Sequence, residues 1–497
     1  MQKYEALKNA KTDVFSPIDG KKIGDAPVMT IDQVLDAIQR ARVSQKEWCK
    51  KSFKERGEFI RAFTDLLQKN RKEIAELLVL ETGKTMFEAY IFEIASTVRL
   101  ANYFRKNAKR ILKPQKISIS LMKNRSSYLH FGPRGVIFVI SPWNFPLSNS
   151  MGEVLMGLIA GNAVLLKPAS LTPLTVLRIR ELFDQAGLDK DLFQVITGPG
   201  KLASEIIDKG EINFVSFTGS TETGRKVAEL CGRHIVPCTM ELGGKAPALV
   251  LSDADPEKAA QSVTFGAFAN SGQICASIER VLVHESIYDR FLDRCLAITK
   301  SLRQGDPREA EVDIGAITDP RQMEVIESLL NDAVSKGAKI LTGGRRMIPG
   351  SNFFEPTIIT NVDEKMAVMR EESFGPLMPV MQFKEESEAV RIANDTRYGL
   401  LASVYSENRR HARDVAERIE AGTVIINDAL ITHSFPEVPW MGIKDSGFGR
   451  IHSDEGLREL CLCRHVNQEV VSINNPVWYP YTQKKLDRLL KVLDFFG

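Results

Sequence analysis

Two segments of this chain carry residues suited to covalent chemistry. Cys275 ends Asn270-Ser-Gly-Gln-Ile-Cys275, and Glu241 begins Glu241-Leu-Gly-Gly-Lys245. A thiolate is a soft nucleophile that adds to a carbonyl carbon, and a carboxylate with a tuned pKa can deprotonate the water that cleaves the resulting thioester. We therefore expect Cys275 to be a nucleophile and Glu241 a general base. A buried structural cysteine and a surface glutamate are the alternatives.

A glycine-containing turn follows the strand-like run that ends at Phe217. Gly219 and Gly224 bracket this turn, and glycines there let the backbone approach a pyrophosphate while a helix N-terminus supplies positive potential. The pattern is not the Gly-x-Gly-x-x-Gly fingerprint, so an ordinary strand-to-helix loop is the alternative.

Six short patterns occur in one order and together resemble the non-acylating branch of the aldehyde dehydrogenase superfamily over nearly the whole chain. The glutamate and the cysteine lie 34 positions apart (275 − 241), which agrees with that family's usual spacing. The resemblance implies oxidation of an aldehyde to a carboxylic acid with NAD(P)⁺, through a thiohemiacetal and a thioester on Cys275. The patterns are Ser141-Pro-Trp-Asn-Phe-Pro146, Lys167-Pro-Ala-Ser170, Phe217-Thr-Gly-Ser-Thr-Glu-Thr-Gly224, Glu241-Leu-Gly-Gly-Lys245, Asn270-Ser-Gly-Gln-Ile-Cys275 and Glu372-Ser-Phe-Gly-Pro376.

The resemblance also assigns roles to matching positions. Asn144 is expected to supply a side-chain amide that stabilises the oxyanion, although an Asn in a Pro-flanked turn can instead cap the backbone. Lys167 is expected near the adenosine ribose, Glu372 on the nicotinamide ribose and Phe374 against the nicotinamide. The full set expected to bind NAD or NADP is Ser141, Trp143, Lys167, Ser170, Gly219, Ser220, Gly224, Leu242, Glu372 and Phe374.

Two departures from the family pattern bear on specificity. Many NAD-preferring members have a glutamate where this chain has Ser170, and a carboxylate there repels a 2′-phosphate, so we expect NADP⁺ to be tolerated or preferred. Members specialised for succinate semialdehyde carry arginines at positions comparable to Gly152 and Ala269. Because no arginine clamp is present, we expect an uncharged aliphatic or aromatic aldehyde.

Three other functions remain open at this point. A semialdehyde dehydrogenase would share the same chemistry. An acylating relative would pass its thioester to coenzyme A, but such enzymes generally lack a base equivalent to Glu241. A non-catalytic structural or binding relative would have lost the nucleophile, whereas Cys275 is present.

Composition excludes several other classes of protein. The 66 basic and 63 acidic side chains leave a formal charge of +3, so we expect no nucleic-acid partner. The polar start at residues 1–6 and the absence of 18 consecutive apolar residues indicate a cytoplasmic protein. Seven scattered cysteines indicate reduced thiols. Cys461 and Cys463 lack a second pair for zinc, and we expect no metal site.

The elements that must position these residues form two α/β sets. From Gly135, β-rich runs at 136–140, 163–166, 193–196 and 212–217 alternate with helical stretches. This alternation predicts a Rossmann-like cofactor-binding domain made of residues 1–114 and 133–242, whose first helix follows a capping box at 30–33. A second α/β set, with a strand at 424–427, predicts a catalytic domain at 243–445.

Strict alternation at 117–121, and a similar run at 469–473, predict strands that pair outside the core. They would form a protruding β-arm within 115–132 and 446–473 for oligomerisation, in a homodimer or homotetramer.

Residues 474–497 form a C-terminal extension. An aromatic segment at 475–481 precedes Leu486, Leu489, Leu490, Leu493 and Phe496, which share one helical face beside Lys484, Lys485, Arg488 and Lys491. We favour packing of this helix against its own or a neighbouring subunit, because single amphipathic helices usually face a core. Peripheral contact with an anionic membrane is the alternative.

Overall fold

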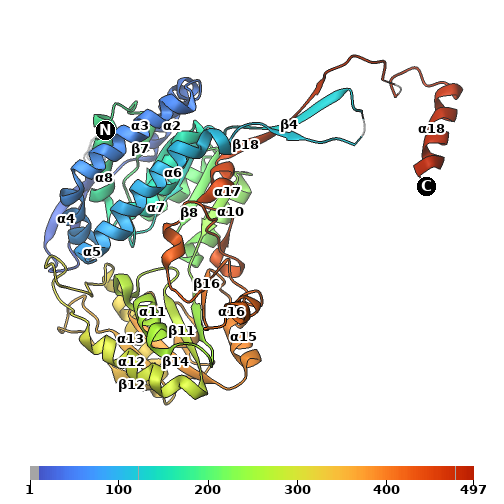
Figure 1. The fold of residues 1–497 in the computed structure, drawn as a ribbon. Helices are drawn as coiled ribbons and strands as arrows, with labels where there is room; N and C mark the ends of the chain where they lie inside the picture. The colour runs from blue at the N-terminus through green and yellow to red at the C-terminus, as the bar shows by residue number, and fades with distance from the viewer. Residues whose placement is uncertain (1–9, 121, 476, 497) are drawn as a thin grey trace.

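The computed structural model describes residues 10–120, 122–475 and 477–496. The polar N-terminal residues 1–6 and Leu121 of the predicted arm strand lie outside the described residues, as does the side chain of Phe496. The predicted α/β class is confirmed, because two largely parallel sheets are each flanked by helices (Figure 1).

The first sheet consists of five parallel strands in the order β9-β8-β5-β6-β7, with β17 antiparallel beside β9. The apolar residues of β5 and β6 are buried on both faces, as expected for strands covered by helices on two sides. The chain runs outward from β5 in both directions, so the order reverses between β5 and β8. The strands are β5 (Val136–Ile140), β6 (Ala163–Lys167), β7 (Phe193–Val195), β8 (Phe214–Thr218), β9 (Cys238–Glu241) and β17 (Gly447–Phe448).

Helices cover both faces of the first sheet, and the predicted capping box of the first one is present. Thr30 accepts from the backbone of Gln33, whose side chain accepts from the backbone N–H of Thr30. The helices are α2 (Ile31–Trp48), α3 (Phe53–Lys69), α4 (Arg71–Thr82), α5 (Met86–Glu88), the π-helix η1 (Ala89–Ala95), α6 (Ser96–Ile111), α7 (Ser148–Ala160), α8 (Pro173–Gln185), α9 (Gly200–Asp208), α10 (Thr221–Arg233) and α17 (Ser453–Glu459).

The second sheet has the order β12-β13-β14-β11-β10-β15-β16, and all neighbouring pairs except β12 and β13 are parallel. Its strands are β10 (Ala246–Val250), β11 (Ile278–His284), β12 (Lys339–Thr342), β13 (Thr357–Thr360), β14 (Leu377–Phe383), β15 (Leu401–Tyr405) and β16 (Thr423–Ile426). Its main helices are α11 (Pro256–Phe268), α12 (Tyr288–Ser301), α13 (Pro320–Ser335), α14 (Ala367–Arg370), α15 (Glu386–Asn394) and α16 (Arg409–Ala416). A hairpin of β1 (Lys11–Phe15) and β2 (Lys22–Pro27) precedes the first sheet.

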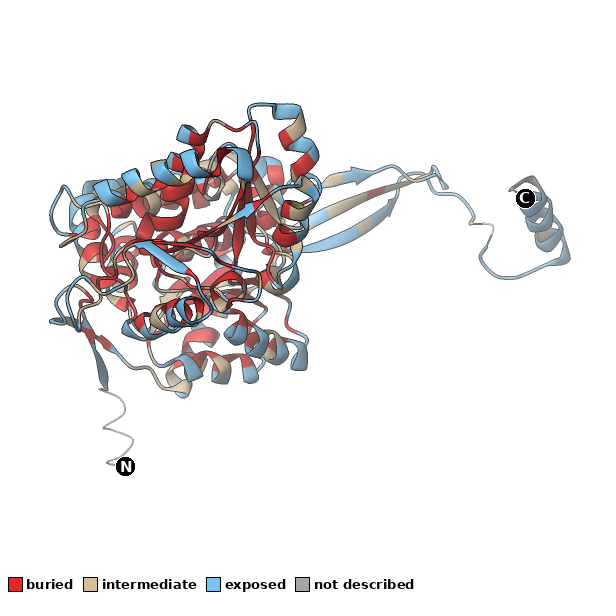
Figure 2. Ribbon diagram, turned by 90° about the horizontal axis from the view of Figure 1, so that it is seen from below, coloured by how far each residue is buried: buried red, intermediate tan, exposed pale blue. Residues whose placement is uncertain are grey.

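A three-stranded arm projects from the side of the first sheet (Figures 1 and 2). It has the order β18-β4-β3, formed by β3 (Gln115–Ile117), β4 (Arg125–Pro133) and β18 (Cys461–Glu469). The predicted strands at 117–121 and 469–473 are therefore misplaced, because β3 ends at Ile117 and β18 ends at Glu469. They also do not pair with each other, since both pair with β4. The alternating apolar and polar residues thus lie in exposed chain at the tip of the arm and not in the segments that pair.

Beyond the arm, the helix α18 (Gln483–Phe496) stands away from the rest of the molecule. Its described side chains are exposed or intermediate, so the described part of the helix does not pack against its own core, contrary to one of the predicted arrangements. Among the described residues, no helix is both long enough and apolar enough to span a bilayer.

Candidate active site

Four of the predicted site segments follow neighbouring strands of the first sheet. Ser141 comes directly after β5, Lys167 ends β6, Gly219 comes directly after β8 and Glu241 ends β9. The carboxyl ends of parallel strands meet at one edge of a sheet, and a crevice opens there where the strand order reverses. The edge of the sheet between β5 and β8 is therefore where we expect a dinucleotide to bind.

Cys275 lies just before β11, after a turn with unusual backbone angles. Asn270 and Ser271 have φ values of 51° and 56°, and Gly272 follows with 74°. A Cβ at position 272 would overlap the backbone of Gly375, so this turn packs tightly against the loop that carries Glu372. Left-handed conformations of non-glycine residues are costly and persist where the surroundings fix them, often at functional sites.

Two glycines connect Glu241 to the second sheet and allow it to approach Cys275. A Cβ on Gly244 would overlap the carbonyl oxygen of Cys275. A Cβ on Gly243 would lie 2.5 Å from a carboxylate oxygen of Glu372. Only glycine fits between these groups, so the linker brings the base and the thiol, which the sequence separates, to one site.

Burial dominates the electrostatics of this site. It raises the pKa of the Cys275 thiol to about 12, and the carboxylates of Glu241 and Glu372 act in the same direction. Burial and the nearby Glu153 raise the pKa of Glu241 well above its usual value, while a hydrogen bond from Trp440 opposes the shift. The Oε1 atom of Glu241 has no protein hydrogen-bond partner. Such a carboxylate binds a proton more tightly than an exposed glutamate does, as a general base requires.

Asn144, in the middle of the loop between β5 and α7, reaches the turn that leads to Cys275. Its Nδ2 donates to the carbonyl oxygen of Gln273 at 2.9 Å. The backbone carbonyl oxygen of Asn144 accepts from Nζ of Lys84 at 2.8 Å. The side-chain amide is therefore held on the turn that leads to Cys275.

Lys84 and Glu93, which the sequence interpretation missed, hold this loop in place. Their buried ion pair has an N–O distance of 2.6 Å. Glu93 also accepts from the backbone of Leu147 and Ser148, at 3.1 and 2.7 Å. Glu93 lies on η1, and π-helical turns occur mainly at functional sites. The sequence offered one indication of this pair: Lys84 is followed by two acidic residues, Glu88 and Glu93, in a largely apolar stretch.

The predicted phosphate-binding residues lie at the start of α10. Ser220 is exposed and caps the helix, accepting from the backbone of Thr223. A Cβ on Gly224 would overlap the side chain of Leu242, so the missing side chain lets the first turn of the helix pack against the chain leaving β9. The free backbone N–H groups and the exposed cap suit a phosphate.

Lys167 and Ser170 lie at the end of β6. Burial lowers the pKa of Lys167 to about 8. The hydroxyl of the exposed Ser170 donates to the carbonyl of Gly198 at 3.1 Å. Ser141 accepts a hydrogen bond from the buried hydroxyl of Ser150 at 2.7 Å, which fixes the start of the loop that carries Asn144.

Glu372 and Phe374 reach the crevice from the second sheet. Glu372 accepts from the backbone of Gly244 at 2.8 Å, and burial raises its pKa to about 8. The ring of Phe374 meets Trp143 edge to face, with centroids 5.3 Å apart. This aromatic contact joins the two sheets across the cofactor side of the site.

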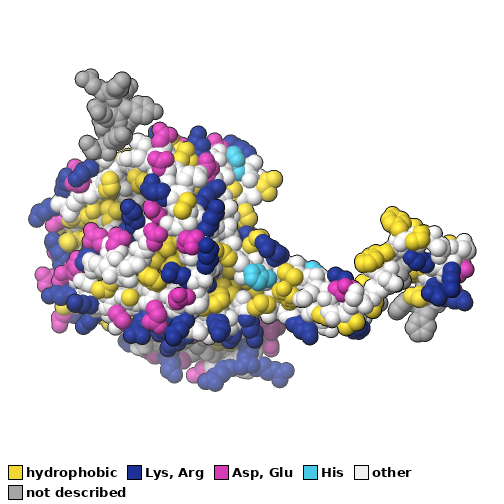
Figure 3. Space-filling view, turned by 90° about the horizontal axis from the view of Figure 1, so that it is seen from above, with side chains coloured by type: hydrophobic (Ala, Val, Ile, Leu, Met, Phe, Trp, Pro, Cys, Tyr) yellow, Lys and Arg dark blue, Asp and Glu magenta, His cyan; other side chains and the backbone are white. Residues whose placement is uncertain are grey.

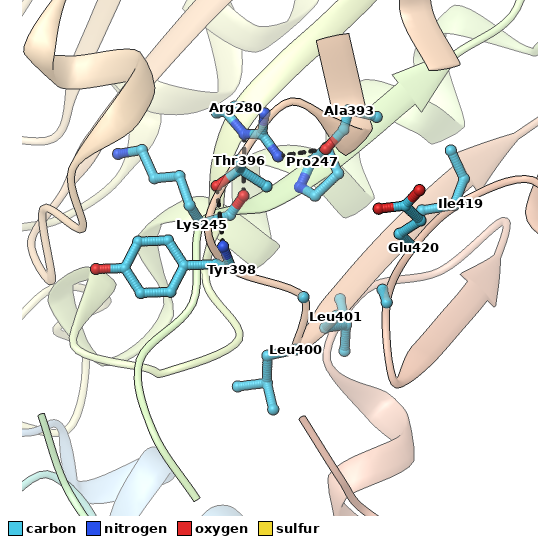
Figure 4. A pocket seen from close by; sticks show the side chains of 12 residues that line it. Lys245, Pro247, Arg280, Ala393, Thr396, Tyr398, Leu400, Leu401, Ile419 and Glu420 are labelled. Carbon is cyan, nitrogen blue, oxygen red and sulfur yellow. Dashed lines mark hydrogen bonds between the residues drawn. The ribbon is translucent and has the colours of Figure 1, made fainter. Parts of the chain in front are cut away.

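The loop of Glu372 and Phe374 is held by a second buried ion pair that sequence reasoning missed. Lys245 and Glu279 approach to 2.6 Å, and Glu279 accepts from the backbone of Ser373 and Phe374 at 2.7 and 2.9 Å. Figure 4 shows the neighbouring pocket, where Arg280 donates to the carbonyls of Lys245 and Ala393. Because the guanidinium is engaged by backbone, this pocket supports the loop rather than binding an anion.

Three phenylalanines, Phe92, Phe145 and Phe265, lie close together. The ring of Phe92 lies 6.2 Å from Phe145 and 6.4 Å from Phe265. Phe92 and Cys275 pack against the same apolar core, and 49% of Phe265 is exposed. We call these three residues the aromatic cluster.

Across the described ranges, no group of three or more His, Cys, Asp or Glu side chains is arranged to hold a metal ion.

Comparison with known proteins is consistent with this geometry. A model of the aldehyde dehydrogenase family matches residues 4–466. The chain is 35% identical over 490 residues to the 4,4'-diapolycopene aldehyde oxidase of Methylomonas sp, covering 97% of this chain and 90% of that protein. The structure of a succinate-semialdehyde dehydrogenase from Burkholderia pseudomallei aligns with a TM-score of 0.90 and 35% identity, covering 93% and 95% of the two chains. An NADP dependent enzyme from E. coli aligns with a TM-score of 0.90 and 34% identity, with the same coverage.

Proposed function

Since this chain belongs to the aldehyde dehydrogenase family and is an NAD(P)-dependent enzyme that oxidises aldehydes to acids, we propose that Cys275, Glu241 and Asn144 perform the reaction. The observation that carries this assignment is the contact between the Gly243-Gly244 linker and the turn of Cys275, which leaves no room for a side chain. This contact brings Glu241, at the end of β9, beside Cys275.

The proposed reaction begins when the thiol of Cys275 releases its proton to solvent water and the resulting thiolate Sγ adds to the carbonyl carbon. The oxygen becomes an oxyanion, stabilised by Nδ2 of Asn144 and by the backbone N–H of Cys275. When bound, NAD(P)⁺ would supply the acceptor for the hydride of that carbon, and Cys275 would then carry a thioester. Glu241 then takes a proton from water, the water oxygen forms the new bond to the acyl carbon, and the C–S bond breaks to release the acid.

The residues of the crevice fit a dinucleotide. The start of α10 would offer backbone N–H groups to the phosphates, with Gly219 and Ser220 beside them. Leu242 packs under this turn, against Gly224. Glu372 and Phe374 would hold the nicotinamide end, with Trp143 packed behind. Ser141, Lys167 and Ser170 would line the adenosine end. We propose that NADP⁺ is tolerated or preferred, because the neutral Ser170 does not repel a 2′-phosphate.

The proposed substrate is an uncharged aliphatic or aromatic aldehyde. Phe92 of the aromatic cluster packs against the same apolar core as Cys275, and the family resemblance puts Gly152 and Ala269 at the positions where an acid-binding clamp has arginines. The relative from Methylomonas sp is named a 4,4'-diapolycopene aldehyde oxidase, a name that contains no acid group, which supports the same choice. A semialdehyde is the second candidate, because another relative is a succinate-semialdehyde dehydrogenase.

One substrate panel tests this proposal. NAD(P)H absorbance would be followed with hexanal, benzaldehyde and succinate semialdehyde, with and without coenzyme A. We expect hexanal or benzaldehyde to give the higher kcat/KM and coenzyme A to have no effect. A succinate semialdehyde value more than about tenfold above both, a difference of roughly 1.4 kcal/mol in transition-state binding, would overturn the choice of substrate.

Assembly and domain division are also proposed. The outer edge strand β18 exposes Leu462, and an exposed edge is a template for pairing with another chain. A homodimer or homotetramer formed through the arm is therefore proposed.

Residues 1–114 and 133–242 are proposed to form the cofactor domain, joined by β17, and residues 243–445 are proposed to form the catalytic domain. All seven cysteines are free thiols, which supports a cytoplasmic location.

A further inference from the structure

The described residues of the C-terminal extension form a small unit separate from the body of the enzyme. The backbone N–H groups of Val470 and Val471 donate to Asn124 at the arm tip. Farther along, the hydrogen bonds of the described residues are internal: Nζ of Lys485 donates to the carbonyl of Trp478, and its backbone N–H donates to Thr482. Residues 477–494, which we call the C-terminal unit, thus fold on themselves and away from the core (Figures 1 and 2).

One face of α18 within this unit is apolar and open. The exposed fractions of its side chains lie between 48% and 55%. A single helix of 14 residues is marginal in water, so this face requires an apolar environment from outside the chain. The residues are Leu486, Leu489, Leu490, Val492 and Leu493.

The charges beside this face select among possible environments. Lys484, Lys485, Arg488 and Lys491 outnumber Asp487 and Asp494 in the unit, and Figure 3 shows basic and apolar groups side by side at its end. A second copy of this chain has a formal charge of +3, so it offers no net attraction to a basic helix. A surface of anionic lipid attracts each basic side chain within a Debye length.

The aromatic residues at the start of the unit add a second observation. Trp478, Tyr479 and Tyr481 are 60%, 81% and 70% exposed. Trp and Tyr are enriched at the boundary between lipid headgroups and hydrocarbon, because one part of each ring system is apolar and the other is polar. Their position next to a basic amphipathic helix is typical of a segment that lies in a membrane interface.

We propose that the C-terminal unit binds the surface of an anionic lipid bilayer, with the leucine face of α18 inserted and the basic residues at the headgroups. At 1.5 Å per residue, the 14 residues of α18 extend about 21 Å, short of the roughly 30 Å hydrocarbon core, so the helix lies along the surface rather than across the membrane. This contact is independent of the residues that perform the reaction. It would keep the enzyme beside apolar aldehydes dissolved in lipid.

Sedimentation of the full-length protein with vesicles tests this proposal. One set of vesicles contains phosphatidylcholine alone, and the other contains phosphatidylcholine with phosphatidylserine. Two variants that each add one negative charge are compared: Leu489→Glu on the apolar face and Gln483→Glu as the control. We expect binding to the anionic vesicles only, a loss of at least about tenfold for Leu489→Glu, and a loss below about threefold for Gln483→Glu.

Two further measurements distinguish binding to a membrane from binding to a second copy of the chain. Unchanged turnover of soluble hexanal shows that each variant is folded, and light scattering gives the mass of the assembly. Equal binding to both kinds of vesicle, or equal losses in both variants, would overturn the proposal. If the unaltered protein does not sediment with anionic vesicles and Leu489→Glu reduces the mass of the assembly, the unit binds a second copy instead.

Discussion

The side-chain amide of Asn144 donates to the carbonyl oxygen of Gln273 at 2.9 Å and thereby joins the loop after β5 to the turn that ends at Cys275. The two segments belong to different sheets, and 129 positions separate them in sequence. This contact ties the proposed oxyanion donor to the turn that carries the proposed nucleophile. A donor fixed before the reaction needs no reorganisation when negative charge develops.

Asn144→Ala should therefore lower kcat by about 10²–10³-fold, as expected for removal of one oxyanion donor. Asn149→Ala, five residues later in the first turn of α7, is the matched control and should change kcat by less than about twofold. Steady-state kinetics with hexanal measures both. Equal effects in the two variants would remove the proposed role of Asn144.

The ion pair of Lys84 and Glu93 should be important for stability. Lys84→Met leaves a buried carboxylate without its partner, and such a change costs about 3–5 kcal/mol in the free energy of unfolding. Lys72→Met removes an exposed pair and should cost less than about 1 kcal/mol. Urea denaturation followed by fluorescence gives both values. If the two variants unfold at the same urea concentration, the ion pair does not support the loop.

Strand patterns and local motifs predicted the first sheet well. β5 begins and ends where the apolar run does, and the glycine linker and the turn of Cys275 were both identified. Buried ion pairs were missed, because Lys84 and Glu93 show only as charged residues in a helical stretch and their mutual approach depends on a π-helix. The arm strands were misplaced because alternation of apolar and polar residues also occurs in exposed, unpaired chain. The strand to which both pair, β4, shows this alternation less clearly.

Glu153 provides a test of the proposed base through pH. Burial raises the pKa of Glu153 to about 7, and its negative charge raises the pKa of Glu241. Hydrolysis requires deprotonated Glu241, so activity falls as the pH decreases through that raised pKa. In Glu153→Gln the neighbouring charge is gone, the pKa of Glu241 falls, and the acidic limb of the profile of kcat should move to lower pH. An acidic limb that stays in place or moves to higher pH would contradict Glu241 as the base.

Ser170→Glu should change the choice of cofactor. A carboxylate at the end of β6 repels a 2′-phosphate and accepts hydrogen bonds from ribose hydroxyls, so the ratio of kcat/KM for NADP⁺ over NAD⁺ should fall by at least about tenfold. Ser170→Gln, of similar size and without charge, is the control and should change this ratio much less. A preference of the unaltered enzyme for NAD⁺ above about a hundredfold, roughly 3 kcal/mol, would contradict the proposed use of NADP⁺.

The most direct test of the account is the mass of Glu241→Gln after mixing with hexanal and NADP⁺. Without its base, the enzyme should form the thioester but hydrolyse it slowly, so one hexanoyl group should accumulate and peptide mapping should locate it on Cys275. Cys275→Ala should neither gain this mass nor turn over aldehyde. A Glu241→Gln protein that reduces NADP⁺ without ever carrying an acyl group, together with an active Cys275→Ala enzyme, would contradict covalent catalysis at Cys275.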